Sequence, residues 1–254
     1  MDISRSLVHA SASFDEITEN SRIGPLLQSM NQQYLGKEFN GTEGIDGDQL
    51  TSTNIDLLSE SMPLCMLQCH KGLKREHHLK HHARVQYGFF LKGAGMSMEE
   101  QLAHMSREFS KLSSQEDYNK KYAYNVRHLY GKEGGRKNYP PKNCQKIIMG
   151  PVPQNGEHHG CPFRHSTSES LTSMLRSTRI GEPDIKSMVK LKEEKQFNLA
   201  CQKHFLVTHP GAENQTDCSD VGNHPNAWFK SSRSYHTAVT NRNGLGNNTT
   251  FVKT

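Results

Sequence analysis

Four cysteines lie far apart in this chain, and their positions limit how it can fold. Cys65 falls in the first turn of a predicted helix, and Cys144 stands just before an apolar pair. Cys161 is placed between a glycine and a proline, and Cys201 lies in a short apolar run. A fold in which these four residues meet ties together four segments that are remote in sequence.

We expect these cysteines to be reduced thiols. Residues 1–5 open no apolar signal region, and nothing approaches 18 consecutive apolar residues, so the sequence predicts a chain that is neither secreted nor membrane-spanning. Cysteines in such a chain bind metal more often than they form disulfides. Their wide spacing does not fit a zinc finger, which needs two close pairs.

An iron–sulfur cluster fits the same positions better. Free backbone N–H groups at helix starts and tight corners can bond to cluster sulfurs, and a following proline, as in the pair Cys161-Pro162, cannot compete for those bonds. Ordinary burial of four cysteines is the alternative. Cys69, one helical turn from Cys65, is a possible further ligand, and Cys218 lies in a polar loop.

Charge is unevenly distributed along the chain. Hydrophobic residues make up 33% of the sequence, which is low for a compact domain and indicates some disorder or a fastener other than an apolar core. Residues 1–60 carry ten acids and three bases. Residues 65–92 carry six bases and one acid, and residues 121–146 carry seven bases and one acid. Two such basic segments are typical of a phosphate-binding surface, although solvated helix faces would look the same.

The pattern predicts a mostly α-helical fold. We expect residues 1–53 to be an acidic leader and linker with one helix at about 23–35, residues 54–209 to be the ordered domain, and residues 210–254 to be a polar, disordered tail. Helices are predicted from about Pro63, over 79–91, 97–112, 118–130 and 168–177, around 184–191, and around 199–206. Ser97-Met98-Glu99-Glu100 matches a capping box. Glycines and prolines make residues 131–163 irregular.

Several short motifs resemble one known family. They are Leu64-Cys65-Met66, His77-His78-Leu79-Lys80-His81, Arg84-Val85-Gln86-Tyr87, Phe90-Leu91-Lys92-Gly93, Tyr122-Ala123-Tyr124-Asn125-Val126-Arg127-His128, Gly131-Lys132-Glu133-Gly134, His159-Gly160-Cys161-Pro162-Phe163-Arg164 and Ala200-Cys201-Gln202-Lys203. In order and spacing, from about Leu26 to His209, the chain resembles the C-terminal domain of the eukaryotic-type DNA primase large subunit.

The resemblance implies two helical lobes joined by a [4Fe–4S] cluster on Cys65, Cys144, Cys161 and Cys201. It also implies a nuclear, non-catalytic regulatory domain that supports RNA primer initiation in DNA replication, with no catalytic residues of its own. The implied partners are the DNA template and RNA primer, the small catalytic subunit of primase and DNA polymerase alpha, without a membrane.

The same resemblance implies that the domain holds the template–primer junction and the 5′-triphosphate. The candidate contact residues are His78, Lys80, His81, Arg84, Tyr87, Lys92, Tyr122, Tyr124, Asn125 and Arg127. Lys80, His81 and Arg84 lie within about one helical turn, so they can converge on one triphosphate. The tyrosines offer flat faces for unpaired bases, and Asn125 offers an amide donor. Lys92 and Arg127 suit backbone phosphates.

The sequence also departs from the family pattern. Lys80 and His82-Ala83 stand where arginine and a Gly-Gly pair are expected, and Met105 replaces an aromatic residue. The family's N-terminal docking domain has no counterpart except the helix at 23–35. A truncated or divergent relative that only binds nucleic acid, a zinc-stabilised nucleic-acid-binding module and an electron-transfer iron–sulfur protein therefore stay open as alternatives.

Overall fold

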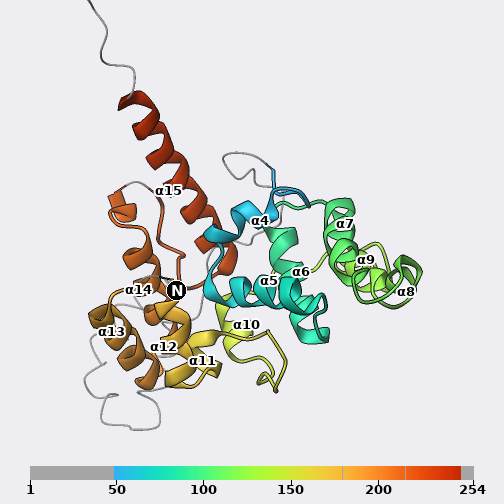
Figure 1. The fold of residues 1–254 in the computed structure, drawn as a ribbon, viewed down its shortest axis with the longest axis horizontal. Helices are drawn as coiled ribbons and strands as arrows, with labels where there is room; N and C mark the ends of the chain where they lie inside the picture. The colour runs from blue at the N-terminus through green and yellow to red at the C-terminus, as the bar shows by residue number, and fades with distance from the viewer. Residues whose placement is uncertain (1–48, 179, 215, 247–254) are drawn as a thin grey trace, which may run out of the picture. The chain divides into compact units, whose positions relative to one another are not determined.

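The computed structural model describes residues 49–178, 180–214 and 216–246, which form helices and connecting loops with no β-strand among them (Figure 1). The mostly α-helical class is therefore confirmed for this part of the chain. Residues 1–48, including the predicted helix at 23–35 and most of the acidic leader, lie outside the described residues. None of the described helices is long and apolar enough to cross a membrane.

The helices follow the predicted order. The first half holds α4 (Ile55–Leu58), the 3-10 turn η1 (Ser59–Ser61), α5 (Leu64–Glu76), α6 (His81–Gly93), α7 (Met98–Phe109), α8 (Gln115–Lys121) and α9 (Ala123–Leu129). The second half holds α10 (Cys144–Ile148), α11 (Pro162–His165), α12 (Ser168–Arg176), α13 (Glu182–Glu193), α14 (Phe197–Thr208), η2 (Ala212–Asn214) and α15 (Pro225–Gly246). The single helix predicted over 118–130 is wrong, because the backbone at Tyr122 (φ −123°) separates α8 from α9.

The capping box before α7 forms only in part. The Ser97 hydroxyl accepts a hydrogen bond from the Glu100 N–H at 3.2 Å, as predicted. The Glu100 carboxylate does not return to Ser97, because it accepts a hydrogen bond from the Ser52 N–H at 2.5 Å. The carboxylate thus fastens the start of the described chain to α7.

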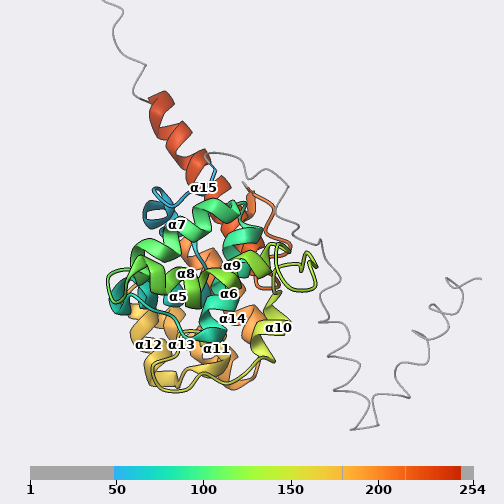
Figure 2. The same cartoon turned by 90° about the vertical axis from the view of Figure 1, so that its right-hand side faces the viewer.

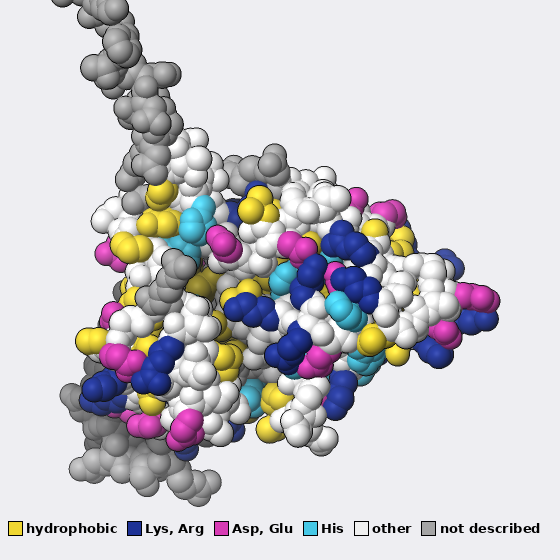
Figure 3. Space-filling model, viewed as in Figure 1, with side chains coloured by type: hydrophobic (Ala, Val, Ile, Leu, Met, Phe, Trp, Pro, Cys, Tyr) yellow, Lys and Arg dark blue, Asp and Glu magenta, His cyan; other side chains and the backbone are white. Residues whose placement is uncertain are grey.

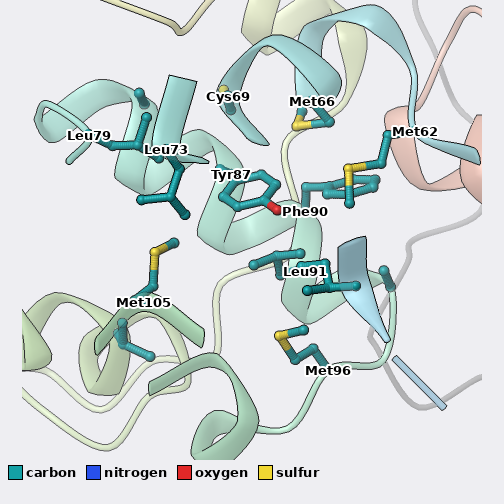
Figure 4. Close-up of a cluster of buried hydrophobic side chains, with 14 of the residues drawn as sticks. Met62, Met66, Cys69, Leu73, Leu79, Tyr87, Phe90, Leu91, Met96 and Met105 are labelled. Carbon is teal, nitrogen blue, oxygen red and sulfur yellow. The ribbon is translucent and has the colours of Figure 1, made fainter. Parts of the chain in front are cut away.

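Apolar side chains gather in three clusters, which we call the first, second and third cores. The first core comes mainly from α5, α6 and α7, with Tyr87 and Phe90 near its centre (Figure 4). The second core comes from α11 to α14 together with Leu64 of α5, and the third lies between α14 and the start of α15. In Figures 1 and 2, α12 and α13 lie well apart from α7 and α8. The helices α7 and α8 therefore contribute to the first core, whereas α12 and α13 contribute to the second.

The prediction of a disordered tail after residue 209 is wrong for residues 210–246, except for Gln215, which is not described. Phe229 is fully buried in the first core, 5.5 Å from Phe90 between ring centroids, and Trp228 is buried in the third core. The Asn226 amide donates to the Phe90 carbonyl at 2.8 Å. The average composition of this segment is polar, so the sequence analysis overlooked its few apolar residues. These residues lie together in the first turns of α15 and pack that helix against the domain.

Buried histidines make this packing sensitive to acid. His204 is 4% exposed, its ring stacks 5.1 Å from Trp228, and neither ring nitrogen has a hydrogen-bond partner among the described residues. Burial, with a smaller effect of His209, lowers the pKa of His204 to about 3. Because the unfolded chain takes up a proton near pH 6.5, the folded state loses stability as the pH falls below that value.

We therefore expect substitution His204→Phe to flatten the acid sensitivity. Between pH 7 and pH 5 a histidine that stays neutral only in the folded state costs about 2 kcal/mol of the free energy of unfolding. Phe keeps the stacked ring and removes both unpartnered nitrogens, so the variant should match wild type at pH 7 and lose about 2 kcal/mol less at pH 5. Urea unfolding followed by the fluorescence of Trp228 measures both values. Equal losses in the two proteins would contradict this account.

Candidate cofactor cavity and nucleic-acid interface

The four widely spaced cysteines line a single cavity. Cys65 comes from the first turn of α5, Cys144 from the start of α10, Cys161 from the residue before α11, and Cys201 from α14. The cavity measures about 350 Å³, including its open part. The structure therefore brings together the four side chains that the sequence singled out.

This cavity lies where the cores adjoin. Cys65 belongs to the first core, Cys161 packs against the first and second cores, and Cys201 packs against the second and third. The Cys144 N–H donates to the Asn223 carbonyl at 2.9 Å, which holds α10 beside the segment that leads into α15. Whatever occupies the cavity therefore contacts helices from each side of the domain.

The electrostatics of the cavity oppose free thiolates. Burial raises the pKa of all four thiols, and the other three sulfurs raise the pKa of Cys65 further. The pKa of Cys161 rises only to about 11, because the backbone N–H groups of Arg164 and Phe163 bond to its sulfur and partly offset burial. These N–H groups stand at the start of α11, as expected for a thiolate ligand at a helix start.

The other two cysteines do not line the cavity. Cys69 is fully buried, and its thiol donates to the His158 carbonyl at 2.9 Å. The possibility that Cys69 is a further ligand is therefore not supported. Cys218 packs against the third core. Among the described residues no group of three His, Cys, Asp or Glu side chains is arranged to hold a single metal ion.

A second candidate site lies at the N-terminus of α6. No side chain caps this helix, and its first turn carries no acidic residue, so its first N–H groups and the positive end of its dipole stay available. Lys80 and His81 are both exposed there. The N-termini of α5 and α14 also lack a side-chain cap and an acidic first turn, whereas Ser97, Ser114 and Thr167 cap α7, α8 and α12 with their side chains.

Arg84 is fixed one turn into α6. Its guanidinium donates to the Leu79 carbonyl at 2.7 Å and to the Asn125 side-chain oxygen at 3.2 Å, and it lies 4.9 Å from the centre of the Tyr122 ring. Because the side-chain oxygen of Asn125 accepts a hydrogen bond from Arg84, the NH2 group of Asn125 is the part that can donate to a ligand. The arginine is therefore held in place by α9 rather than free in solvent.

Aromatic residues beside Arg84 differ in how much they expose. Tyr122 is half-buried and packs 4.8 Å from Phe109 and 5.6 Å from His78 between ring centroids. His78 is itself half-buried between the same two rings. Tyr124 is 45% exposed, so among these candidates it offers the most accessible face for a base.

Two predicted contact residues are structural instead. Tyr87 is fully buried in the first core (Figure 4). Its hydroxyl hydrogen-bonds to His70 Nδ1 at 2.8 Å. The prediction that Tyr87 stacks on a template base is wrong, because no face of its ring reaches solvent. Lys92 is 7% exposed, and its ammonium donates to the carbonyls of Leu129 and Tyr139 at 2.9 and 2.8 Å. The prediction that Lys92 contacts phosphate is also wrong, because this ammonium links α6 to α9 and to the loop that follows.

Arg127 is partly neutralised. Its Nε donates to Glu133 Oε1 at 2.7 Å, so a phosphate would have to compete with this carboxylate. Two residues outside the candidate contact set, His82 and Lys142, act electrostatically on His81. Lys142 lies in the basic segment 121–146, which the sequence analysis associated with a phosphate-binding surface without naming this lysine.

Comparison with known proteins agrees with this arrangement. The family model that describes the C-terminal domain of the eukaryotic and archaeal DNA primase large subunit matches residues 56–229. The DNA primase large subunit of Homo sapiens is 40% identical over 229 residues, which cover 89% of this chain and 44% of that protein. The DNA primase large subunit of Saccharomyces cerevisiae is 32% identical over 243 residues, covering 91% of this chain and 46% of that protein.

A plant relative extends the match. A probable DNA primase large subunit of Arabidopsis thaliana is 35% identical over 216 residues, covering 85% of this chain and 46% of that protein. The chain thus spans less than half the length of these relatives. The family match covers α4 to the first turns of α15 and includes all four cavity cysteines and the N-terminus of α6. The chain therefore belongs to the family of the C-terminal domain of the eukaryotic and archaeal DNA primase large subunit.

Proposed function

We propose that this chain is a non-catalytic primase domain that binds a template–primer junction and the 5′-triphosphate at the primer start, and so supports RNA primer initiation in the nucleus. The observation that carries the proposal is the exposed, uncapped N-terminus of α6, flanked by Lys80, His81 and Arg84. Catalysis belongs to a separate small subunit, because the related proteins are named large subunits.

A triphosphate suits this helix end for two reasons. Helix N-termini bind phosphate through free N–H groups and the helix dipole. Burial lowers the pKa of His81, and so do the positive charges of Arg84, His82 and Lys142, as expected of a site with surplus positive charge. A bound polyanion relieves that repulsion. The exposed ring of Tyr124 on α9 can then stack on a neighbouring base.

The cavity suits a [4Fe–4S] cluster held by Cys65, Cys144, Cys161 and Cys201. Cys65 is buried, the other three cysteines are half-buried, and all four line one cavity, yet the described side chains are not arranged around a single-ion position. A tetrahedral zinc needs its sulfurs within about 4 Å of each other, whereas a cluster spreads its ligands around several irons. The raised pKa values of the thiols also require positive charge nearby before the sulfurs can be thiolates.

The bound cluster would supply cross-links between the cores in addition to the apolar contact that Leu64 of α5 makes with the second core. The chain's own residues prepare its place: the start of α11 directs N–H groups at Cys161, and the Asn143 side chain caps α10 beside Cys144. We infer that the first core, which carries α6, and the second core, which carries Cys201 on its rim, take up their relative positions with the help of this cofactor.

Anaerobic purification tests the cofactor. We expect a brown protein with iron and acid-labile sulfide in equal amounts, about four of each per chain. Substitution Cys201→Ala or Cys144→Ala should remove most of the iron, because each would leave the cluster with three protein ligands. Iron and sulfide analysis, together with the visible absorption spectrum, measures the loss.

The matched control is Cys69→Ser. This residue is buried and hydrogen-bonded outside the cavity, so its variant should keep the full iron content if it folds, which circular dichroism can verify. A colourless wild-type protein with stoichiometric zinc would overturn the cluster assignment.

Junctions with different 5′ ends test the triphosphate site. The protein should bind a junction with a 5′-triphosphate more tightly than one with a 5′-hydroxyl, and Lys80→Gln should reduce that preference roughly tenfold, as expected for one charged hydrogen bond. Fluorescence anisotropy measures the affinities. Lys190→Gln, an exposed charge on α13, is the matched control and should leave the preference intact. Equal affinity of the wild type for both ends would remove the site from α6.

The same site predicts a pH dependence. The pKa of free His81 lies below its ordinary value, and a bound triphosphate raises it, so binding takes up a proton. Affinity for the triphosphate end should therefore rise as the pH falls from 7.5 to 6. The titration of the triphosphate itself contributes part of this rise, and substitution His81→Gln should flatten the remaining part. An unchanged profile in the variant would show that His81 does not contact the bound ligand.

A further inference from the structure

A second basic surface lies outside the proposed triphosphate site. We call it the α5–α7 face, and it consists of Lys71, Lys74 and Arg75 on α5 and Arg107 and Lys111 on α7 and just beyond its end. Figure 3 shows Lys and Arg side chains gathered on the face where these helices lie. None of the five residues is a candidate contact residue from the sequence, and none lines the cysteine cavity.

One buried carboxylate organises this face. Glu108 is 1% exposed and lies 3.0 Å from the Lys74 ammonium, 2.6 Å from that of Lys111 and 4.0 Å from Arg107 Nε. Burial by itself raises the pKa of Glu108, but hydrogen bonds from Lys111, Lys74 and His77 bring it down to about 2. Glu108 is therefore ionised at neutral pH and holds several cations close together at the surface.

The cations keep capacity for an external ligand. The Lys111 ammonium contacts only Glu108 among the described residues, so two of its three N–H donors are unused. Lys71 is exposed and forms no ion pair with any described residue. The carboxylates near the face are Asp56, Glu76, Glu100 and Glu108, fewer than the five basic side chains, and Glu108 is shielded from solvent.

The α5–α7 face is connected to the triphosphate site through a short turn. α5 ends at Glu76, and α6 begins at His81, with residues 77–80 between them. His77 bonds to Glu108 at 3.0 Å, and Lys80 stands three residues later at the N-terminus of α6. Three residues span at most about 11 Å. One continuous nucleic-acid strand can therefore contact both surfaces.

We propose that the α5–α7 face binds the backbone phosphates of a single-stranded segment that continues from the junction held at α6. This inference rests on the proposed function. The exposed apolar side chains beside the face are Leu57 and Leu112, so charge, and not the cluster of apolar anchors on which protein partners usually rely, is its main feature. Contacts to phosphates need no such anchors and read no sequence.

Overhang length provides the test. Triphosphate-bearing junctions with a short and a long template overhang are titrated at several salt concentrations against wild type and Lys71→Gln/Lys111→Gln. We expect wild type to bind the long overhang more tightly. The double variant should lose that gain, and its slope of log affinity against log salt should shrink by about 1.4 for two lost single-strand phosphate contacts. The preference for the 5′-triphosphate should remain.

Two controls keep the test decisive. The double variant Lys186→Gln/Lys190→Gln removes two exposed charges from α13 and should leave the overhang gain intact. Lys71→Gln alone removes a charge that has no ion pair with a described residue, so its effect does not depend on the Glu108 network. Circular dichroism verifies that each variant is folded.

The contrary outcomes are distinct. Equal binding of short and long overhangs by wild type, or a double variant that keeps the full overhang gain, overturns the role of the α5–α7 face. Stronger binding of a polyglutamate peptide than of the overhang, abolished by the double variant, assigns the face to an acidic protein and also overturns it. If wild type shows no preference for the 5′-triphosphate, the α6 site is refuted instead. This outcome comes from comparing junctions with different 5′ ends, so it is separate from the comparison of overhang lengths.

Discussion

The proposed function depends on the meeting of four cysteine side chains in one cavity at the edge of adjoining hydrophobic cores. Cys65 is buried and the other three cysteines are half-buried, and the charge of one thiolate would repel the others, so four thiolates cannot share this cavity without added positive charge. Apolar packing does not remove the problem, because the cores adjoin the cavity without filling it. In the proposed assignment, the cluster that supplies this charge also fixes the position of α6 relative to α14.

Helix α6 links this constraint to the proposed function. Its central and C-terminal part is buried through Tyr87, Phe90 and Leu91, and Lys92 ties its end to α9. Its N-terminus stays uncapped and exposed, with Arg84 locked against Asn125 and Tyr122. A rigid helix with one end in a core and the other open to solvent can hold a phosphate without reorganising, which lowers the entropy cost of binding.

Buried charge is used in two different ways on the same side of the domain. The ammonium of Lys92 donates its hydrogen bonds to oxygens inside the domain, so it contributes to stability and does not bind an external ligand. Glu108 acts in the opposite way. Its buried carboxylate forms ion pairs with Lys74 and Lys111, whose remaining N–H donors stay at the surface. Lys74 and Lys92 lie in the same basic segment of the sequence, and only their partners distinguish an internal lysine from one with donors at the surface.

Local patterns in the sequence determined most of the helices before residue 210, the N-cap at Ser97 and the four cysteines as a set, because caps, helical period and Cys-Pro corners act over a few residues. They also pointed to Arg84, Lys80 and His81 as neighbours, because one helical turn fixes that spacing. Tertiary structure alone decided that Tyr87 and Lys92 face inward and that Cys69 stays outside the cavity. It also decided that Trp228 and Phe229 anchor the C-terminal helix to the domain. These outcomes depend on which distant side chains share a core. The sequence pattern of one segment does not indicate which surface of the domain that segment will contact.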